Sequence, residues 1–139
     1  MSDEMKFAKI AYIVPFQIGE NNNREPVLLI NSPKDKEISL GISLFFIGLI
    51  PGIVYSVSCT LRPDDESSDS LQYAVQKKFK VEDVLGLEGP SPTAVEIPIT
   101  LKPPVLSDQY RIEATLNSEN GTFSEAKWAK SFVEIRVEE

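Results

Sequence analysis

The most constraining feature of this chain is an uncharged segment, residues 38–61, in a sequence of which 25% of the residues are charged. Large apolar residues alternate with serine and glycine before Pro51-Gly52, and with serine and threonine after it. A period of two is typical of β-strands with one buried face, whereas a membrane-spanning helix would be apolar on every side. The segment therefore predicts two buried strands, residues 38–47 and 53–61, joined by a corner, and no membrane span.

Further segments show the same alternation: residues 7–16, 27–30, 71–81, 93–101, 110–116 and 122–137. In residues 7–16, the side chains that share one face are Ile10, Tyr12, Val14 and Phe16. Short connections rich in turn residues separate these segments, and none of the segments has the 3.6-residue period of a helix. The sequence therefore predicts an all-β fold, a single antiparallel β-sandwich of about eight strands, immunoglobulin-like or C2-like, that forms one domain over residues 1–139.

Irregularities in the alternation predict where individual strands lie. Lys77 interrupts the apolar face of residues 71–81, which indicates a bulge or a position near a sheet edge. Pro98 lies inside residues 93–101, and because proline cannot donate a ladder hydrogen bond, this strand is expected at an edge or interrupted. The apolar parity of the last strand changes near Ser131, which predicts a bulge there.

The composition argues against catalysis. The chain has no histidine and one cysteine, Cys59. Imidazole-based catalysis, thiolate zinc clusters and paired-cysteine redox chemistry are therefore excluded, and no glycine-rich phosphate loop is present. We expect a protein that is not an enzyme, has no cofactor and takes no small-molecule ligand.

The charge and the cysteine content indicate the environment. The formal net charge is −7, which argues against a nucleic-acid partner because phosphate binding needs a clustered basic surface. Cys59 lies in the apolar register of its strand, so we expect a buried thiol and no intrachain disulfide. The first residues are acidic and lack the apolar run of a secretory signal. The sequence therefore predicts a cytoplasmic protein.

The corner of the uncharged segment carries a recognisable motif. Leu49, Pro51-Gly52 and Tyr55 resemble the tyrosine corner of immunoglobulin-like and fibronectin type III domains. The resemblance implies that the hydroxyl of Tyr55 bonds back to the chain upstream of it. Residues 101–110, which end in Tyr110, are a looser version of the same motif. This is a resemblance at the level of the fold, which serves many roles, so it implies no function.

An acidic loop follows the second buried strand. Its carboxylates are those of Asp64, Asp65, Glu66 and Asp69. Such a loop at the end of a sandwich could hold calcium, as the loops of C2-like domains do. The alternative is a solvated loop whose charges keep the protein soluble. The sequence lacks the spacing of an EF-hand loop and a paired-aspartate motif in a second loop, so no metal site is expected here.

An apolar set lies out of phase with the core of the first buried strand: Phe45, Ile47, Leu49 and Ile50. Alternation directs Phe45 and Ile47 away from the core residues Leu44 and Phe46. Something must cover a face of this kind, either the chain itself or a partner. We treat these residues as candidate contact residues of a protein interface.

Trp128 is the only tryptophan and lies among charged residues of the last strand. We expect it to anchor the core. A surface position would instead make it a contact hot spot or a platform for stacking a sugar ring, and it is kept as a candidate contact residue.

The leading hypothesis is a non-catalytic module for protein–protein contact or assembly, self-association into a homodimer included. The alternative is an acidic inhibitor or decoy that docks on a basic partner surface. A calcium-dependent C2-like module and a carbohydrate-binding module are the remaining alternatives. Ionic strength separates the first two, because an acidic decoy should bind more weakly in salt than an apolar interface does.

Overall fold

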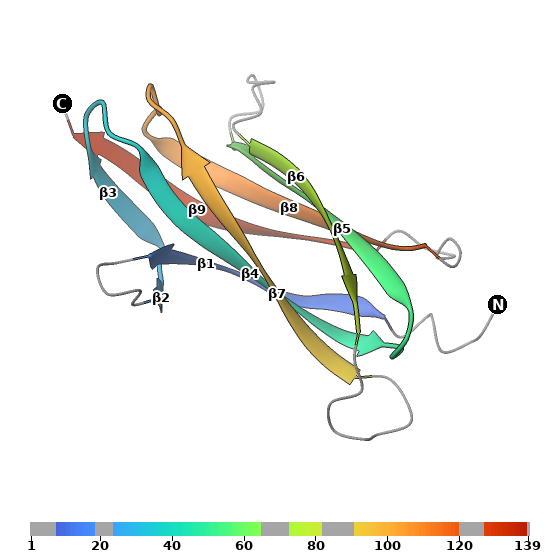
Figure 1. Ribbon diagram of the computed structural model, residues 1–139. Coiled ribbons are helices and arrows are strands. Elements are labelled where there is room, and N and C mark those ends of the chain that lie inside the picture. The colour runs from blue at the N-terminus through green and yellow to red at the C-terminus, as the bar shows by residue number, and fades with distance from the viewer. Residues whose placement is uncertain (1–7, 19–23, 65–72, 82–90, 120–126, 139) are drawn as a thin grey trace.

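The computed structural model describes residues 8–18, 24–64, 73–81, 91–119 and 127–138 of the chain. In these ranges two β-sheets face each other and enclose one core (Figure 1). The first sheet has the strand order β2 (Arg24–Pro26), β1 (Lys9–Ile18), β4 (Ile38–Leu49) and β7 (Ser91–Leu101). The second has the order β3 (Leu29–Pro33), β9 (Lys127–Glu138), β8 (Asp108–Ser118), β5 (Val54–Pro63) and β6 (Tyr73–Lys80).

The architecture confirms the predicted β-sandwich. Each sheet contributes alternate side chains to the core, as the burial along β4 illustrates. Leu44 is 0% exposed and Phe46 1% exposed, whereas Phe45 between them is 39% exposed. None of the described residues forms a helix long and apolar enough to cross a membrane.

The connection from β1 to β4 was only partly predicted. The short strand β2 pairs with β1, and β3 then joins the other sheet beside β9. The β3–β9 pair is parallel, from Leu29 opposite Glu134 to Pro33 opposite Glu138, so the expectation of a wholly antiparallel sandwich was wrong. The direction of this pair depends on a partner about one hundred residues further along the chain, and alternation within β3 carries no information about it.

Both edge predictions are confirmed, because β7 and β6 are the outer strands of their sheets. These edges meet along one side of the sandwich. The hydroxyl of Tyr73 donates to the carbonyl of Pro98 at 3.3 Å, and Lys77 Nζ donates to the carbonyl of Glu96 at 3.2 Å. The pairing of β6 with β5 has no register shift, so Lys77 marks an edge and no bulge.

The bulge predicted near Ser131 is absent. The register of β9 against β8 is continuous from Ile135 opposite Asp108 to Lys127 opposite Leu116. Trp128 and Phe132 differ in parity from the core residues of β9 because both point outward, with exposed fractions of 60% and 44%. The error came from treating an aromatic side chain as evidence of an inward direction.

Both tyrosine corners are confirmed. The hydroxyl of Tyr55 accepts a hydrogen bond from the backbone N–H of Ile50 at 2.9 Å, and the hydroxyl of Tyr110 donates to the carbonyl of Leu106 at 2.7 Å. Both tyrosine side chains are fully buried. Gly52 supplies the positive φ of 89° that the first corner needs, which residues with a Cβ rarely adopt. One hydrogen bond therefore links the start of β5 to the connection before it, and the other links the start of β8 to the connection before that strand. Because β5 and β8 are antiparallel, the two bonds lie at opposite ends of the pair.

Cys59 is buried on β5, and its burial raises the pKa of the thiol to about 11. We expect alkylation by iodoacetamide at pH 8 to be at least about a thousandfold slower in the folded protein than in denaturant, because the thiol must first be exposed by unfolding. Since the pKa is higher in the folded state, the stability that the neutral thiol contributes is present below pH 9 and is lost as the pH rises toward 11. Urea midpoints measured between pH 8 and 11 should therefore fall, and rapid labelling of the native protein would contradict the assignment.

Candidate functional site: exposed residues on the two sheet faces

The outer face of the first sheet carries an apolar row. Phe45 of β4 lies between Tyr12 of β1 and Ala94 of β7 in the strand register, and cross-strand partners point to the same side of a sheet. Ile47 follows Phe45 on this face and lies opposite Lys9. The exposed fractions are 70% for Tyr12, 39% for Phe45 and 45% for Ile47. We call this set, Tyr12, Phe45, Ile47 and Ala94, the β4 surface.

The structure separates the candidate residues of β4. Phe45 and Ile47 point outward, as alternation predicted. Leu49 is 0% exposed and is a core residue, so its place among the contact residues was wrong. Gly48 adopts a φ of 75° and the β4–β7 register shifts between Phe46 and Leu49, which reverses the direction of Leu49. Ile50 is half-buried at the tyrosine corner, so the β4 surface ends at Ile47.

Tyr12 was missed as a surface residue. The expected common face of β1 is broken by a register shift between Ile10 and Tyr12, which leaves Ile10 against the core and Tyr12 outside. Val14 and Phe16 follow Tyr12 on the outer face, opposite Ser43 and Gly41. Since both sides of this strand are apolar, the sequence held no signal for the shift.

Phe16 limits the exposed apolar area at the other end of this face. Its ring covers Gly41, where an added Cβ would lie 2.1 Å from the nearest ring carbon. An aromatic ring placed over a glycine in a neighbouring strand supplies the packing that glycine lacks. Phe16 is consequently only 6% exposed although it points outward. The β4 surface is therefore a local patch at the Tyr12 end of the sheet.

The outer face of the second sheet has its own exposed aromatic residues. Trp128 and Phe132 of β9 flank Lys130, and all three are exposed. Trp128 was expected to anchor the core, and this expectation was wrong. In the register of β8 and β9, Trp128 lies opposite Thr115 and Phe132 opposite Arg111.

Two arginines lie beside Phe132. Arg62 of β5 and Arg111 of β8 are direct cross-strand partners. Arg111 contacts two carboxylates, with Nη1 3.5 Å from Asp64 Oδ1 and Nε 2.8 Å from Glu113 Oε1. Nε of Arg111 and Nε of Arg62 are both buried, and neither has a hydrogen-bond partner among the described residues. The contact between Arg111 and Glu113 is therefore an ion pair without a hydrogen bond.

The acidic loop is described only at its start. Asp64 faces Arg111, and its backbone N–H donates to the carbonyl of Gln109 at 2.8 Å. Asp65, Glu66 and Asp69 lie outside the described residues. Within the described ranges no three metal-ligating side chains come together, and calcium binding by this loop stays an untested alternative.

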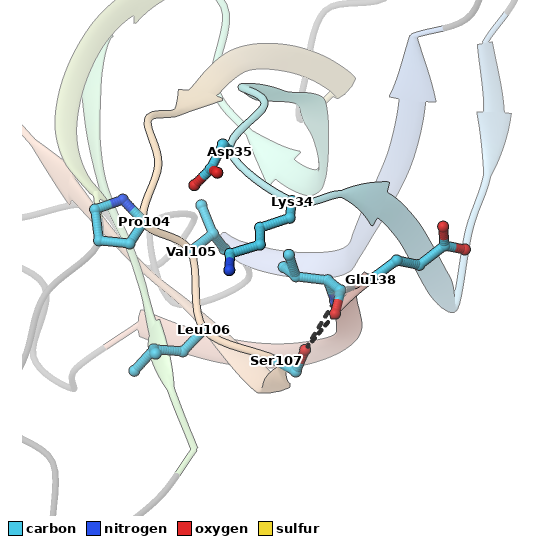
Figure 2. Close-up of a pocket in the computed structure, with 8 residues that line it drawn as sticks. Lys34, Asp35, Pro104, Val105, Leu106, Ser107 and Glu138 are labelled. Atoms are coloured by element: carbon cyan, nitrogen blue, oxygen red, sulfur yellow. Dashed lines mark hydrogen bonds between the residues drawn. The ribbon is translucent and has the colours of Figure 1, made fainter.

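A hollow of about 350 Å³ lies at one end of the sandwich, between the β3–β4 turn, the connection before β8 and the end of β9 (Figure 2). Ser107 binds the backbone of Val137 there, accepting from its N–H at 2.8 Å. Leu106 and Glu138 point away to opposite sides (Figure 2). The charged lining groups are Lys34, Asp35 and Glu138.

The comparisons with known proteins support the fold and assign no function. No family model and no curated protein match the sequence. A bacterial adhesin from Mobiluncus mulieris matches with a TM-score of 0.58 and 10% identity over 94% of this chain and 57% of that one. A putative β-galactosidase from Bacteroides fragilis matches with a TM-score of 0.57 and 9% identity over 90% of this chain and 17% of that one. A β-glucuronidase from Bacteroides uniformis matches with a TM-score of 0.54 and 15% identity over 73% of this chain and 12% of that one.

The chain thus spans between 12% and 57% of the length of these neighbours. At such low identities the likeness shows an immunoglobulin-like β-sandwich and carries no activity with it.

Proposed function

We propose that the chain is a non-catalytic β-sandwich module that works by protein–protein contact, and that the partner of the β4 surface is a second copy of the chain. The observation that carries the proposal is the arrangement of charge around the exposed apolar row. Lys9 lies at one corner of the row and Glu96 at the opposite corner. A surface of this kind is complementary to itself.

The register defines these corners. Phe45 is the centre of the patch. Lys9 lies one strand away from it on β1, beside Ile47. Glu96 lies one strand away in the other direction, on β7 beside Ser43. With strands about 4.8 Å apart and outward rows about 6.8 Å apart, the two charges lie on a straight line through Phe45, at equal distances from it.

A two-fold axis in the plane of this face, passing through Phe45 perpendicular to that line, brings two copies together face to face. Lys9 of each copy then meets Glu96 of the other, and Ile47 meets the small side chain of Ala94. The strands of the two sheets cross at roughly 70°, which is closer to the orthogonal class of sheet packing than to the aligned one. Each contact away from the axis occurs twice, as in any isologous interface.

The size of the surface sets the expected strength. An aromatic side chain buries about 150–250 Å². At the exposed fractions of 70% and 39%, Tyr12 and Phe45 together offer roughly 200 Å². A stable interface buries about 800 Å² on each partner, so we expect a weak dimer that dissociates on dilution.

A charge exchange tests the arrangement. Lys9→Glu places two acidic residues at each corner contact, and we expect it to raise the dimer Kd about 5- to 30-fold; Glu96→Lys should do the same with two basic residues. The double variant Lys9→Glu with Glu96→Lys restores opposite charges, so its Kd should return to within about threefold of the wild type. Light scattering and sedimentation over a concentration series provide the measurement.

Two further variants complete the design. Phe45→Ser should abolish the dimer, because it removes the apolar centre. Lys80→Glu, which changes an exposed lysine of the other sheet, serves as the charge-matched control and should leave the Kd unchanged. Circular dichroism confirms that each variant is folded. A wild type that stays monomeric at millimolar concentration would overturn the proposal, and so would a double variant that is weaker than both single variants.

A further inference from the structure

The outer face of the second sheet combines exposed aromatic side chains with a pair of arginines. Three successive cross-strand rows run over β5, β8 and β9: Ser58–Thr115–Trp128, Thr60–Glu113–Lys130 and Arg62–Arg111–Phe132. We call this set the β8–β9 surface. Tryptophan and arginine are the residue types most enriched at the energetic centres of protein interfaces.

The arginine pair is the polar part of this surface. Like charges directly opposite each other on neighbouring strands are destabilising. Among the described residues, the two carboxylates that contact the pair, those of Asp64 and Glu113, both contact Arg111. Arg62 forms no ion pair among the described residues, and its Nε is buried without a hydrogen-bond partner. A further carboxylate placed over the pair would relieve the repulsion and could accept two parallel hydrogen bonds from a guanidinium.

The aromatic residues are the apolar part. Trp128, Lys130 and Phe132 are successive outward residues of β9, so they lie about 6.8 Å apart along the strand. An extended peptide lying along β9 repeats its own side chains at the same spacing. Apolar side chains of such a peptide can contact Trp128 and Phe132, while an acidic side chain reaches the arginine pair.

We propose that the β8–β9 surface binds an extended acidic segment of a partner protein, with a carboxylate held by Arg62 and Arg111 and apolar side chains packed on Trp128 and Phe132. Charge complementarity favours an anionic occupant. The chain has a net charge of −7, so an acidic partner is repelled by most of the molecule and attracted to this pair of cations, which also fixes its orientation.

This site is independent of the proposed dimer. The two surfaces lie on the outer faces of different sheets, on opposite sides of the sandwich (Figure 1). Both can therefore be occupied at the same time, and a dimer would present two acidic-peptide sites. Loss of the dimer in the charge-exchange experiment leaves this proposal intact, and the reverse also holds.

The position of Trp128 allows a direct test, because it is the only tryptophan of the chain. The probe is a synthetic peptide that repeats Leu-Ser-Glu-Ser, in which leucine and glutamate alternate on one face of the extended strand, and it is titrated while the fluorescence of Trp128 is followed. We expect saturable binding with a blue shift of the emission, since the peptide covers the 60% exposed indole. A peptide with lysine in place of glutamate should bind at least about tenfold more weakly.

Variants locate the charge recognition. Arg62→Gln and Arg111→Gln should each weaken binding of the glutamate peptide about tenfold, and Lys80→Gln, an exposed lysine at the sheet edge, should change it less than about twofold. Arg62→Gln leaves the contacts of Arg111 with Asp64 and Glu113 in place, so it reports on recognition even where Arg111→Gln is destabilised.

Three results would overturn the proposal. The first is equal binding of the glutamate and lysine peptides, and the second is undiminished binding by Arg62→Gln. The third is a fluorescence change with an uncharged oligosaccharide such as cellohexaose and none with either peptide, which would assign Trp128 to sugar stacking.

Discussion

Replacement of Leu44 by alanine is expected to lower the free energy of unfolding by about 2–5 kcal/mol. Leu44 is 0% exposed at the centre of β4, between the two sheets. The substitution removes apolar contacts and leaves a cavity that close-packed neighbours fill only in part. Because a domain of this size is stable by about 5–15 kcal/mol, the variant loses a large fraction of its stability.

Ile47→Ala is the matched control, since it removes a side chain of similar size from the same strand. Ile47 points away from the core and is 45% exposed, so we expect a cost of about 1 kcal/mol or less. Urea unfolding followed by circular dichroism gives both values. Equal losses at the two positions would mean that β4 does not have one core face and one outer face, and the fold assignment would fail with it.

Removal of the two tyrosine hydroxyls is expected to have the second large effect. Tyr55→Phe leaves the N–H of Ile50 without its acceptor, and Tyr110→Phe leaves the carbonyl of Leu106 without its donor. Each change should cost about 1–3 kcal/mol, because a polar group at a half-buried position loses its partner. The phenyl ring keeps the packing of the side chain, so the loss reports on the hydrogen bond.

The two losses should add in the double variant, to about 2–6 kcal/mol. Tyr55 lies opposite Ser118 and Tyr110 opposite Pro63, at the two ends of the β5–β8 pair, roughly 27 Å apart by strand rise. Thermal and urea unfolding of the single and double variants provide the measurement. A cost below about 0.3 kcal/mol for both single variants would show that the hydroxyls do not fasten the corners.

The local features of the fold were predictable because they depend on residues that are neighbours in sequence. Alternation placed Phe45 and Ile47 on the outer face of β4, since side chains alternate along any strand. Pro98 predicted an edge because it lacks a ladder donor. The hydrogen bond of Tyr55 was predicted by the resemblance of Leu49, Pro51-Gly52 and Tyr55 to a tyrosine corner, a motif that lies within one short segment.

The candidate sites were less predictable, because they depend on how distant segments align. The register shift before Tyr12 and the turn at Gly48 change which side chains reach the β4 surface. The charges of Lys9 and Glu96 become opposite corners of one patch only when β1 and β7 pair with β4. The adjacency of Arg62 and Arg111 likewise exists only in the β5–β8 register.

By itself, the sequence determined that this chain forms paired, one-sided strands around a core with tyrosine-fastened corners. Period two and turn chemistry are patterns of a few neighbouring residues, so they can be recognised without knowing the partner strand. The tertiary structure alone decided the parallel β3–β9 pair, the outward direction of Trp128 and the two composite surfaces. Strand order and register arise from burial summed over both sheets, and a single strand cannot specify them.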